Sequence, residues 1–207
     1  MRNYIHQGNL SFKDKVLSLD YLLIFLILLL GIISFFAMYS TESGNFGYYT
    51  KSHIYRFCVF FIIFFVISFF KIQFWYKSSY LFYFGVLILL FAVDFLGVTA
   101  SGSKRWIHLL IFNLQPSELM KVALIIFLAR YYDKIPSYEA NHFRYMFIPV
   151  FALLIPVSLI ITQPDLGTAV LVGIGGIVVI WLAGFRMKYF IYLSMILVCL
   201  APVVIAF

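Results

Sequence analysis

Charged side chains are scarce in this chain of 207 residues, at 11% of the sequence, whereas 64% of the residues are hydrophobic. Soluble domains are about half apolar and about a quarter charged, so this composition excludes an ordinary soluble domain. It predicts an all-α polytopic membrane protein in which residues 1–207 form a single membrane-embedded domain.

Cysteine is almost absent as well, since only Cys58 and Cys199 occur and both fall inside apolar runs. Two isolated cysteines argue against a disulfide framework, and we expect both to be buried free thiols. The histidines have no spacing typical of a metal-ligand set, so the sequence predicts no metal cluster of imidazoles. They are His6, His53, His108 and His142.

Acidic residues number only 8 against 15 lysines and arginines, which gives a formal charge of +7. The basic residues lie in short loops between apolar runs. This pattern is typical of membrane orientation and of contact with anionic membrane lipids, and it argues against nucleic acid as a partner.

Apolar runs of membrane-spanning length recur along the chain and predict about seven transmembrane helices. The stretch from Lys71 to Ser79 is predicted to be a loop between two of them. The last run stays apolar to the final residue, so we expect the chain to be part of a longer protein with further spans. The predicted spans are Tyr21–Tyr39, Ile54–Phe70, Tyr80–Leu96, Pro116–Tyr131, Tyr145–Ile161, Leu166–Ala183 and Tyr189–Phe207.

The distribution of lysine and arginine predicts a cytoplasmic N-terminus. With that orientation, ten of the 15 basic residues lie on the cytoplasmic side and five on the outer side, as the positive-inside rule requires. Three of the outer five fall between residues 102 and 121 and oppose the rule, which indicates a function for that passage. The outer five are Lys51, Arg56, Lys104, Arg105 and Lys121.

The passage from 102 to 121, GSKRWIHLLIFNLQPSELMK, is the most polar one between the apolar runs. A charge at the centre of a membrane is unfavourable by roughly 2.5–3.5 kcal/mol, so charges near a membrane interior usually mark function. A second polar passage, QPDLG at residues 163–167, is predicted to lie on the same side and to complete one site.

Both passages contain a Gln-Pro-polar sequence at an expected helix start. Pro116 fits the first turn of a helix, where the helix dipole stabilises the carboxylate of Glu118 and Lys121 can pair with it. A capped helix start with one ion pair explains the local pattern equally well. Asp165 follows Pro164 in the same way, so the two acids could share a divalent cation such as Mg²⁺ with a substrate diphosphate.

The basic residues Lys104 and Arg105 precede Trp106, and this triplet has two interpretations. One is a basic-aromatic anchor at the membrane interface, which the residues alone slightly favour. The other is a phosphate grip, because the arginine fork matches phosphate oxygens. Asp94 could pair with one of these cations, and a structural pairing is favoured over a catalytic role for it. Gly173, Gly175 and Gly176 favour close helix packing rather than a nucleotide loop.

The motifs GSKRW, QPSELMK and TQPDLGTA, with an AGF turn after them, resemble the SEDS family (shape, elongation, division and sporulation), and its rod-shape branch more than its division branch. The resemblance covers essentially the whole chain but only the N-terminal part of a family fold of about ten spans. It implies a peptidoglycan glycosyltransferase of the bacterial plasma membrane. Such an enzyme polymerises the precursor lipid II during cell elongation and shape maintenance, with a class B penicillin-binding protein as partner.

Transfer from a lipid-linked diphosphate needs a base for the acceptor hydroxyl and cations for the leaving group. The resemblance places the acidic catalytic residue in an outer loop beyond Phe207, so no catalytic base is assigned within the chain. Glu118, Lys121 and Asp165 are candidates for supporting roles. The candidate substrate-binding residues are Lys104, Arg105, Trp106, Gln115, Ser117 and Gln163.

Two alternatives stay open. A flippase or transporter of a lipid-linked precursor would also carry charges and broken helices within the membrane, although these would lie near its middle with access from both sides. Here the charges gather near one face, which favours surface chemistry. The second alternative is a non-catalytic scaffold of the wall-synthesis complex.

Overall fold

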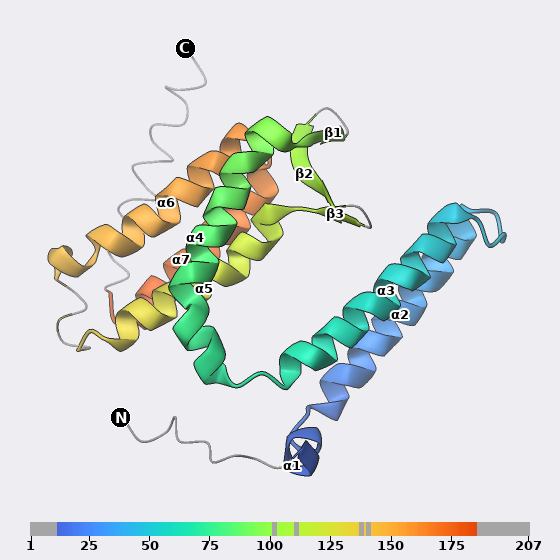
Figure 1. Cartoon of the computed structure of the whole chain (residues 1–207), viewed down its shortest axis with the longest axis horizontal. Helices are drawn as coiled ribbons and strands as arrows, with labels where there is room; N and C mark the ends of the chain where they lie inside the picture. Colours follow the sequence, from blue (N-terminus) through green and yellow to red (C-terminus); the bar gives the residue numbers. More distant parts are fainter. Residues whose placement is uncertain (1–11, 101–102, 110–111, 137–138, 140–141, 186–207) are drawn as a thin grey trace. The chain divides into compact units, whose positions relative to one another are not determined.

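The computed structural model describes residues 12–100, 103–109, 112–136, 139 and 142–185 (Figure 1). The chain divides into two compact units, Met1–Phe74 and Trp75–Phe207, each described by itself. The predicted seventh span, Tyr189–Phe207, and Cys199 lie outside the described residues. Helices α2, α3 and α4 are long and apolar enough to cross a membrane, whereas α6 and α7 are apolar but shorter.

The first unit contains a short helix α1 (Phe12–Leu17) and a hairpin of two long helices, α2 (Tyr21–Thr41) and α3 (Tyr48–Ser68). Helix α2 begins at Tyr21 as predicted, because the Asp20 side chain accepts a hydrogen bond from the Leu23 amide at 3.0 Å. Helix α1 is not predicted by the apolar runs of the sequence.

Helix α3 begins six residues before the predicted start at Ile54. The carboxylate of Glu42, directly after α2, accepts hydrogen bonds from the amides of Tyr49 at 3.0 Å and Thr50 at 2.9 Å, and from the Thr50 hydroxyl. These bonds satisfy amides that the first turn of a helix leaves unpaired, so the helix extends over a polar segment that hydropathy excludes.

The α2–α3 contact is mostly apolar. The aromatic ring of Phe57 lies against Gly31, where a Cβ atom would approach the ring to 2.3 Å. A polar contact joins the two helices, between Ser34 Oγ and His53 Nε2 at 2.9 Å. Cys58 is a free thiol but is exposed on α3, so the prediction that it is buried is wrong. The reason is that nearly all of α3 faces outward, with Thr50 as its single buried residue.

The second unit is a bundle of α4 (Ile72–Leu96, mostly in this unit), α5 (Pro116–Asp133), α6 (Phe147–Thr162) and α7 (Leu166–Leu182), with a short 3₁₀ helix η1 (Phe143–Tyr145) before α6. Helices α5, α6 and α7 pack against one another, and α4 adds Tyr83, Val86 and Leu90 to their core. The starts of α5 and α7 agree with the predicted spans. The largest fully buried side chains of this core include Leu90, Met120, Leu124, Leu128, Ile160 and Ile180.

Two features of the bundle correct or refine the predictions. Helix α4 begins at Ile72, so most of the predicted loop from Lys71 to Ser79 is helical. One reason is that Arg130 of α5 donates hydrogen bonds to the Lys77 carbonyl and the Ser79 hydroxyl, which binds this turn to the bundle.

Of the predicted packing glycines, Gly176 lies in close contact, because a Cβ atom there would meet Leu153 at 2.5 Å and Leu124 at 3.1 Å.

Pro156 interrupts the backbone hydrogen bonds of α6, and a side chain of α4 replaces the missing donor. Pro156 has no N–H, so the carbonyl of Ala152 lacks its usual donor within the helix. The hydroxyl of Tyr83, which is 2% exposed, donates to that carbonyl at 2.8 Å. A neighbouring helix thus satisfies the backbone group that the proline leaves unpaired, as membrane helices require.

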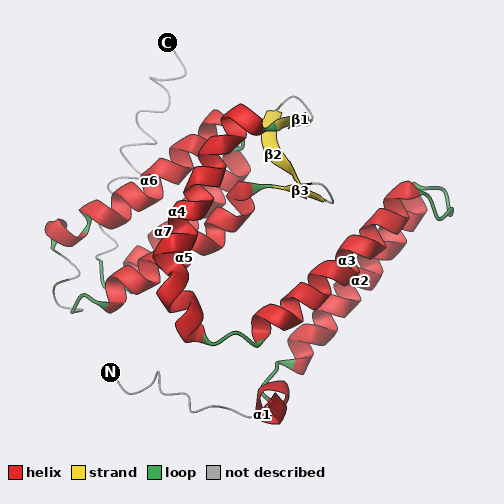
Figure 2. Cartoon of the chain, viewed as in Figure 1, coloured by secondary structure: helices red, strands yellow, loops and turns green. Residues whose placement is uncertain are grey.

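Between α4 and α5 the chain forms three antiparallel strands, β1 (Val98–Ala100), β2 (Ser103–Leu109) and β3 (Phe112–Leu114), in the order β1-β2-β3 (Figure 2). In the β2–β3 hairpin, Ile107 pairs with Leu114 and His108 pairs with Asn113. These strands are not among the predicted elements. The fold is therefore helical with a small sheet, and β2 and β3 contain half of the predicted polar passage.

Candidate functional site

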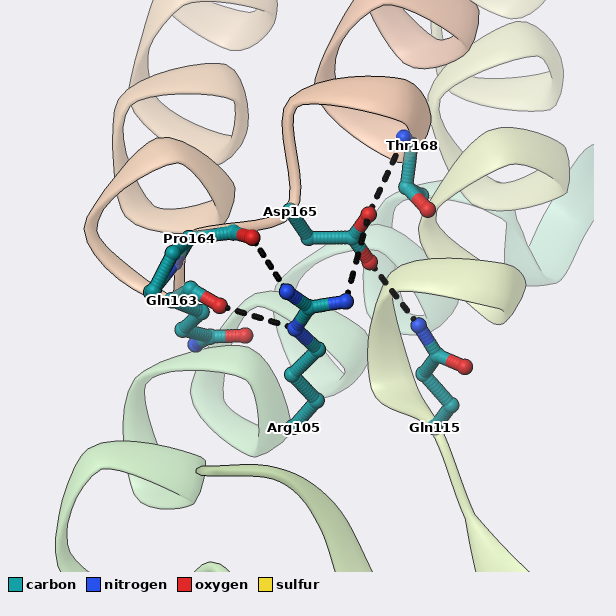
Figure 3. Close-up of polar contacts among 6 residues, drawn as sticks. All are labelled: Arg105, Gln115, Gln163, Pro164, Asp165 and Thr168. Carbon is teal, nitrogen blue, oxygen red and sulfur yellow. Dashed lines mark hydrogen bonds and ion pairs between the residues drawn. The ribbon is translucent and has the colours of Figure 1, made fainter. Parts of the chain in front are cut away.

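The two polar passages meet at one end of the bundle, where α4 and α6 end and α5 and α7 begin (Figure 1). Strand β2 contributes Arg105, and the β3–α5 junction contributes Gln115. The α6–α7 connection contributes Gln163, Pro164 and Asp165 (Figure 3). The structure thus brings together two passages that are about fifty residues apart in sequence.

Asp165 is the acceptor at the centre of this cluster. Its Oδ1 accepts a hydrogen bond from the Thr168 amide at 3.3 Å and so caps the start of α7. Its Oδ2 accepts a hydrogen bond from Gln115 Nε2 at 3.0 Å. The Asp165 side chain is only 12% exposed, so both contacts are sheltered from solvent. The starts of α5 and α7 are therefore joined through one carboxylate.

Arg105 contacts three consecutive residues of the α6–α7 connection (Figure 3). Its Nε donates a hydrogen bond to the Gln163 carbonyl at 3.0 Å, and its Nη2 donates to the Pro164 carbonyl. Its Nη1 lies 3.9 Å from Asp165 Oδ1. Carbonyls at the end of a helix lack intrahelical donors, and a cation there is favourable. The arginine therefore satisfies the backbone just beyond α6.

Gln163 extends the cluster to α4. Its side chain is buried, and its Nε2 donates hydrogen bonds to the Leu90 carbonyl at 2.9 Å and to Asp94 Oδ1 at 3.4 Å. Asp94 forms no ion pair with a cation among the described residues, so the predicted pairing with Lys104 or Arg105 is wrong. For Arg105 the reason is that the α6–α7 connection already occupies its guanidinium.

The start of α5 presents the predicted ion pair. Pro116 occupies the first turn, and Lys121 Nζ lies 2.7 Å from Glu118 Oε2. The Glu118 side chain is 53% exposed and that of Lys121 is 29% exposed, so both are accessible at this end of the bundle. The adjacent Ser117 is 2% exposed, and its predicted contact with substrate stays a prediction.

Strand β2 presents the other predicted residues. Lys104 is exposed, and it has no hydrogen bond or ion pair with any residue that the structure describes. Trp106 is half-buried and pairs with Val98 of β1. Farther along the hairpin, His108 Nδ1 lies 2.6 Å from Asn113 Oδ1. Lys104 is therefore a basic side chain that a ligand can approach.

The described residues include no group of three or more histidine, cysteine, aspartate or glutamate side chains that could hold a metal ion. The two acids expected to share Mg²⁺ each have a protein partner. Glu118 pairs with Lys121, and Asp165 accepts from Gln115 and Thr168. These residues do not by themselves form a magnesium site, so a divalent cation stays a prediction that depends on ligands from the substrate.

Sequence reasoning missed the direct contact between Gln115 and Asp165 and the burial of Gln163. The repeated Gln-Pro-polar sequence was the available signal, since both glutamines precede a helix start and a proline. The carbonyl acceptors of Arg105 had no sequence signal, because any residue type supplies a carbonyl and only the path of the backbone decides which one is in reach.

Known proteins that are similar to this chain in sequence belong to one family. A family model described as FTSW_RODA_SPOVE, cell cycle protein, matches residues 17–207. The chain is 35% identical over 150 residues to the peptidoglycan glycosyltransferase MrdB of Helicobacter pylori. The aligned stretch covers 71% of this chain and 38% of that protein. It is 42% identical over 114 residues to the probable peptidoglycan glycosyltransferase FtsW of Geobacter sulfurreducens, covering 54% and 30%.

Solved structures show the same fold. The rod shape determining protein RodA of Thermus thermophilus superposes with a TM-score of 0.76 and 26% identity, over 89% of this chain and 60% of that one. A chain from a peptidoglycan synthase complex, in a study of the coordination of polymerization and crosslinking, superposes with a TM-score of 0.80 and 26% identity, over 90% and 54%. The matches to the two curated relatives span less than half of their length.

Proposed function

We propose that this chain, which belongs to the FtsW/RodA/SpoVE (SEDS) family, is part of a RodA-type peptidoglycan glycosyltransferase that polymerises lipid II during cell elongation. The observation that carries the proposal is the 35% identity to MrdB over 150 residues. The TM-score of 0.76 to RodA at 26% identity agrees with it. The chain is a multi-pass membrane protein, so it lies in the bilayer that also holds the lipid tail of a lipid-linked donor.

The geometry of the site supports this chemistry. The acceptor hydroxyl forms a bond to the donor sugar while the bond from that sugar to its lipid-linked diphosphate breaks, and cations that meet the developing charge on the diphosphate stabilise the transition state. Lys104 is exposed and Lys121 is partly exposed at the same end of the bundle, where the helix starts of α5 and α7 also direct their amides. The base for the acceptor hydroxyl is expected beyond Phe207.

A reconstituted reaction tests the proposal. The full-length protein, purified in detergent, is incubated with lipid II, and the products are separated by size. We expect glycan polymer, whereas failure to form polymer under conditions in which an authentic RodA is active would contradict the proposal. Movement of labelled lipid II across vesicles without polymer would support the transporter alternative instead.

A class B penicillin-binding protein is the partner we propose. The similarity to a chain of a complex that coordinates polymerization and crosslinking supports it, because crosslinking needs a second activity. Co-purification with a class B penicillin-binding protein and faster polymerisation in its presence are the expected results. Depletion in a rod-shaped host distinguishes the two branches of the family, since loss of a RodA-type protein should give round cells and loss of an FtsW-type protein should give filaments.

The proposed site lies on the outer side of the plasma membrane, with the N-terminus in the cytoplasm. The ten-to-five division of basic residues supports this orientation. Asn113 is exposed in β3, so a cysteine there, in a chain without Cys58 and Cys199, should react with an impermeant thiol reagent added outside. Reaction only after the cytoplasmic face is opened would reverse the orientation.

A further inference from the structure

We infer that Arg105 and Asp165 are positioning residues: with Gln115 and Gln163 they form a clamp that fixes the β2–β3 hairpin and the start of α5 on the α6–α7 connection. This inference rests on the proposed function, because it assigns these residues a role in glycosyl transfer. It gives Arg105 a role different from a phosphate grip or an interfacial anchor.

Arg105 directs its guanidinium toward the α6–α7 connection. A guanidinium has five N–H donors on three nitrogens. In the structure all three nitrogens face the segment from Gln163 to Asp165, two through hydrogen bonds to carbonyls and one toward a carboxylate. A bidentate phosphate contact uses two of these nitrogens. A phosphate at the Nε–Nη2 edge would therefore break both carbonyl contacts that hold β2 to the bundle, and one at the Nη1–Nη2 edge would compete with Asp165 for Nη1.

The carboxylate of Asp165 holds both ends of the β2–β3 hairpin. Arg105 lies near the start of β2, and Gln115 follows β3 directly. Both side chains reach Asp165, at 3.9 Å and 3.0 Å, on a side chain that is 12% exposed (Figure 3). Gln163 continues the connection to the end of α4 through Leu90 and Asp94. The clamp therefore joins α4, β2, α5, α6 and α7.

The clamp lies next to two accessible cations, Lys104 and Lys121. Arg105 lies at a bulge of β2, between Lys104, which pairs with Thr99, and Trp106, which pairs with Val98. The clamp therefore fixes the strand directly beside Lys104. Lys104 is in fact exposed. Gln115 immediately precedes the first turn of α5, which carries Glu118 and leads to Lys121. The clamp thus sets the places of the two accessible cations, Lys104 and Lys121, relative to each other.

A charge exchange across the Gln115–Asp165 contact tests the inference in the full-length protein. Gln115→Glu places a second carboxylate against Asp165, and like charges at this distance disfavour each other. We expect kcat for lipid II polymerisation to fall at least tenfold, with KM changed less than twofold. Adding Asp165→Asn should restore most of kcat, because the asparagine amide can donate to the introduced carboxylate while its oxygen still accepts from the Thr168 amide.

Asn113→Asp is the matched control. It adds the same charge two residues away, but its side chain is exposed and faces His108, so kcat should equal that of the parent. Melting temperature is recorded for every variant. Where Gln115→Glu fails to fold, Asp165→Asn must restore folding. A loss of kcat or of folding that Asp165→Asn does not restore would overturn the clamp.

Arg105→Lys separates positioning from substrate binding. A lysine keeps the charge but reaches at most one of the three acceptors, so the clamp predicts a lower kcat at unchanged KM. A rise in KM alone would identify Arg105 as a substrate ligand and overturn the inference. A parent protein that makes no polymer would overturn the proposed function alone, because restoration of the melting temperature in the charge exchange still tests the clamp.

Discussion

The α2–α3 hairpin and the α4–α7 bundle differ in how much of their helices they bury. Helix α2 has no buried residue and α3 has one, whereas α5 buries eight residues along 18. Yet α2 and α3 are among the helices that length and hydropathy mark as membrane spans, and α5 is not. Hydropathy thus identifies the helices that face outward most fully, while the helix that starts at the site is more polar and better packed.

Their polar contacts differ in the same direction. In the hairpin these contacts join residues close in sequence, as Glu42 does with Tyr49 and Thr50. The bundle has local pairs too, as Lys121 with Glu118, but its site is held by contacts between residues fifty or more positions apart, as Gln115 with Asp165 and Arg105 with Gln163. The hairpin can therefore form from local sequence, whereas the site exists only when the whole bundle has assembled.

The largest expected effect concerns packing inside the bundle. Gly176→Val should lower the free energy of unfolding by about 1–3 kcal/mol, because the new side chain overlaps the packed side chains of Leu153 and Leu124. Thermal unfolding in detergent measures the change. Gly173→Val, on the same helix, is the matched control, because no atom lies within 4 Å of its Cβ position.

The hairpin offers a counterpart to this pair. A Cβ atom on Gly31 would approach the Phe57 ring to 2.3 Å, but the contact is with the far end of one side chain that can rotate outward. Gly31→Ala should therefore shift the melting temperature less than Gly176→Val does. An equal loss in both units would show that the bundle core is no tighter than the hairpin.

Much of the fold follows from the sequence because apolar runs and helix starts are local signals. Tyr21, Pro116 and Leu166 begin helices as predicted, since Asp20, the Gln-Pro sequence and Asp165 mark those starts. The starts of α3 and α4 were missed, because tertiary or loop contacts extend both helices into polar segments. The strands were missed because β1 and β3 have three residues each, too few to show an alternating pattern.

The site was predictable in its location but less so in its contacts. The Glu118–Lys121 pair follows from helical spacing and is confirmed. The role of Arg105 depends on which carbonyls the α6–α7 connection presents, and Asp94 contacts Gln163 rather than a cation. Such contacts between distant segments depend on the assembled fold, so residue type alone could not predict them.

A smaller effect is expected at the proline of α6. Tyr83→Phe removes the hydroxyl that donates to the Ala152 carbonyl, the group that Pro156 leaves without a donor. The loss should be about 1–2 kcal/mol, because a buried carbonyl then has no partner. Unfolding in detergent measures it. If Pro156→Ala abolishes the effect of Tyr83→Phe, the explanation holds, and an unchanged effect in that background would contradict it.

The corresponding contact of the hairpin should contribute less. Ser34→Ala removes the hydrogen bond to His53, and such bonds between membrane helices contribute about 0.6 kcal/mol on average. Partial exposure of both side chains lets other groups replace the lost partner. The comparison with Tyr83→Phe is direct, because each change removes a single hydroxyl. A larger loss for Ser34→Ala would reverse the order of the two units.

The smallest effect is a pH dependence confined to the turn of the hairpin. The Thr50 hydroxyl, and also the amides of Thr50 and Tyr49, donate to Glu42 and hold the pKa of that carboxyl below its usual range, although partial desolvation opposes them. A carboxyl with a lowered folded pKa stabilises the folded state above its unfolded pKa of about 4.3, and this stability is lost as pH falls through the folded value.

Hydrogen exchange at the start of α3 therefore tests this turn. Protection factors, which correct for the intrinsic pH dependence of exchange, should fall for the amides of Tyr49 and Thr50 between about pH 6 and about pH 3. Glu42→Gln should remove most of that pH dependence, and Thr50→Val should move it to higher pH, because the largest cause of the lowered pKa is then gone. Amides in the middle of α3 serve as the internal control. Equal pH dependence in the parent and in Glu42→Gln would show that the carboxylate does not hold the start of α3, and the hairpin would then depend on its apolar contacts alone.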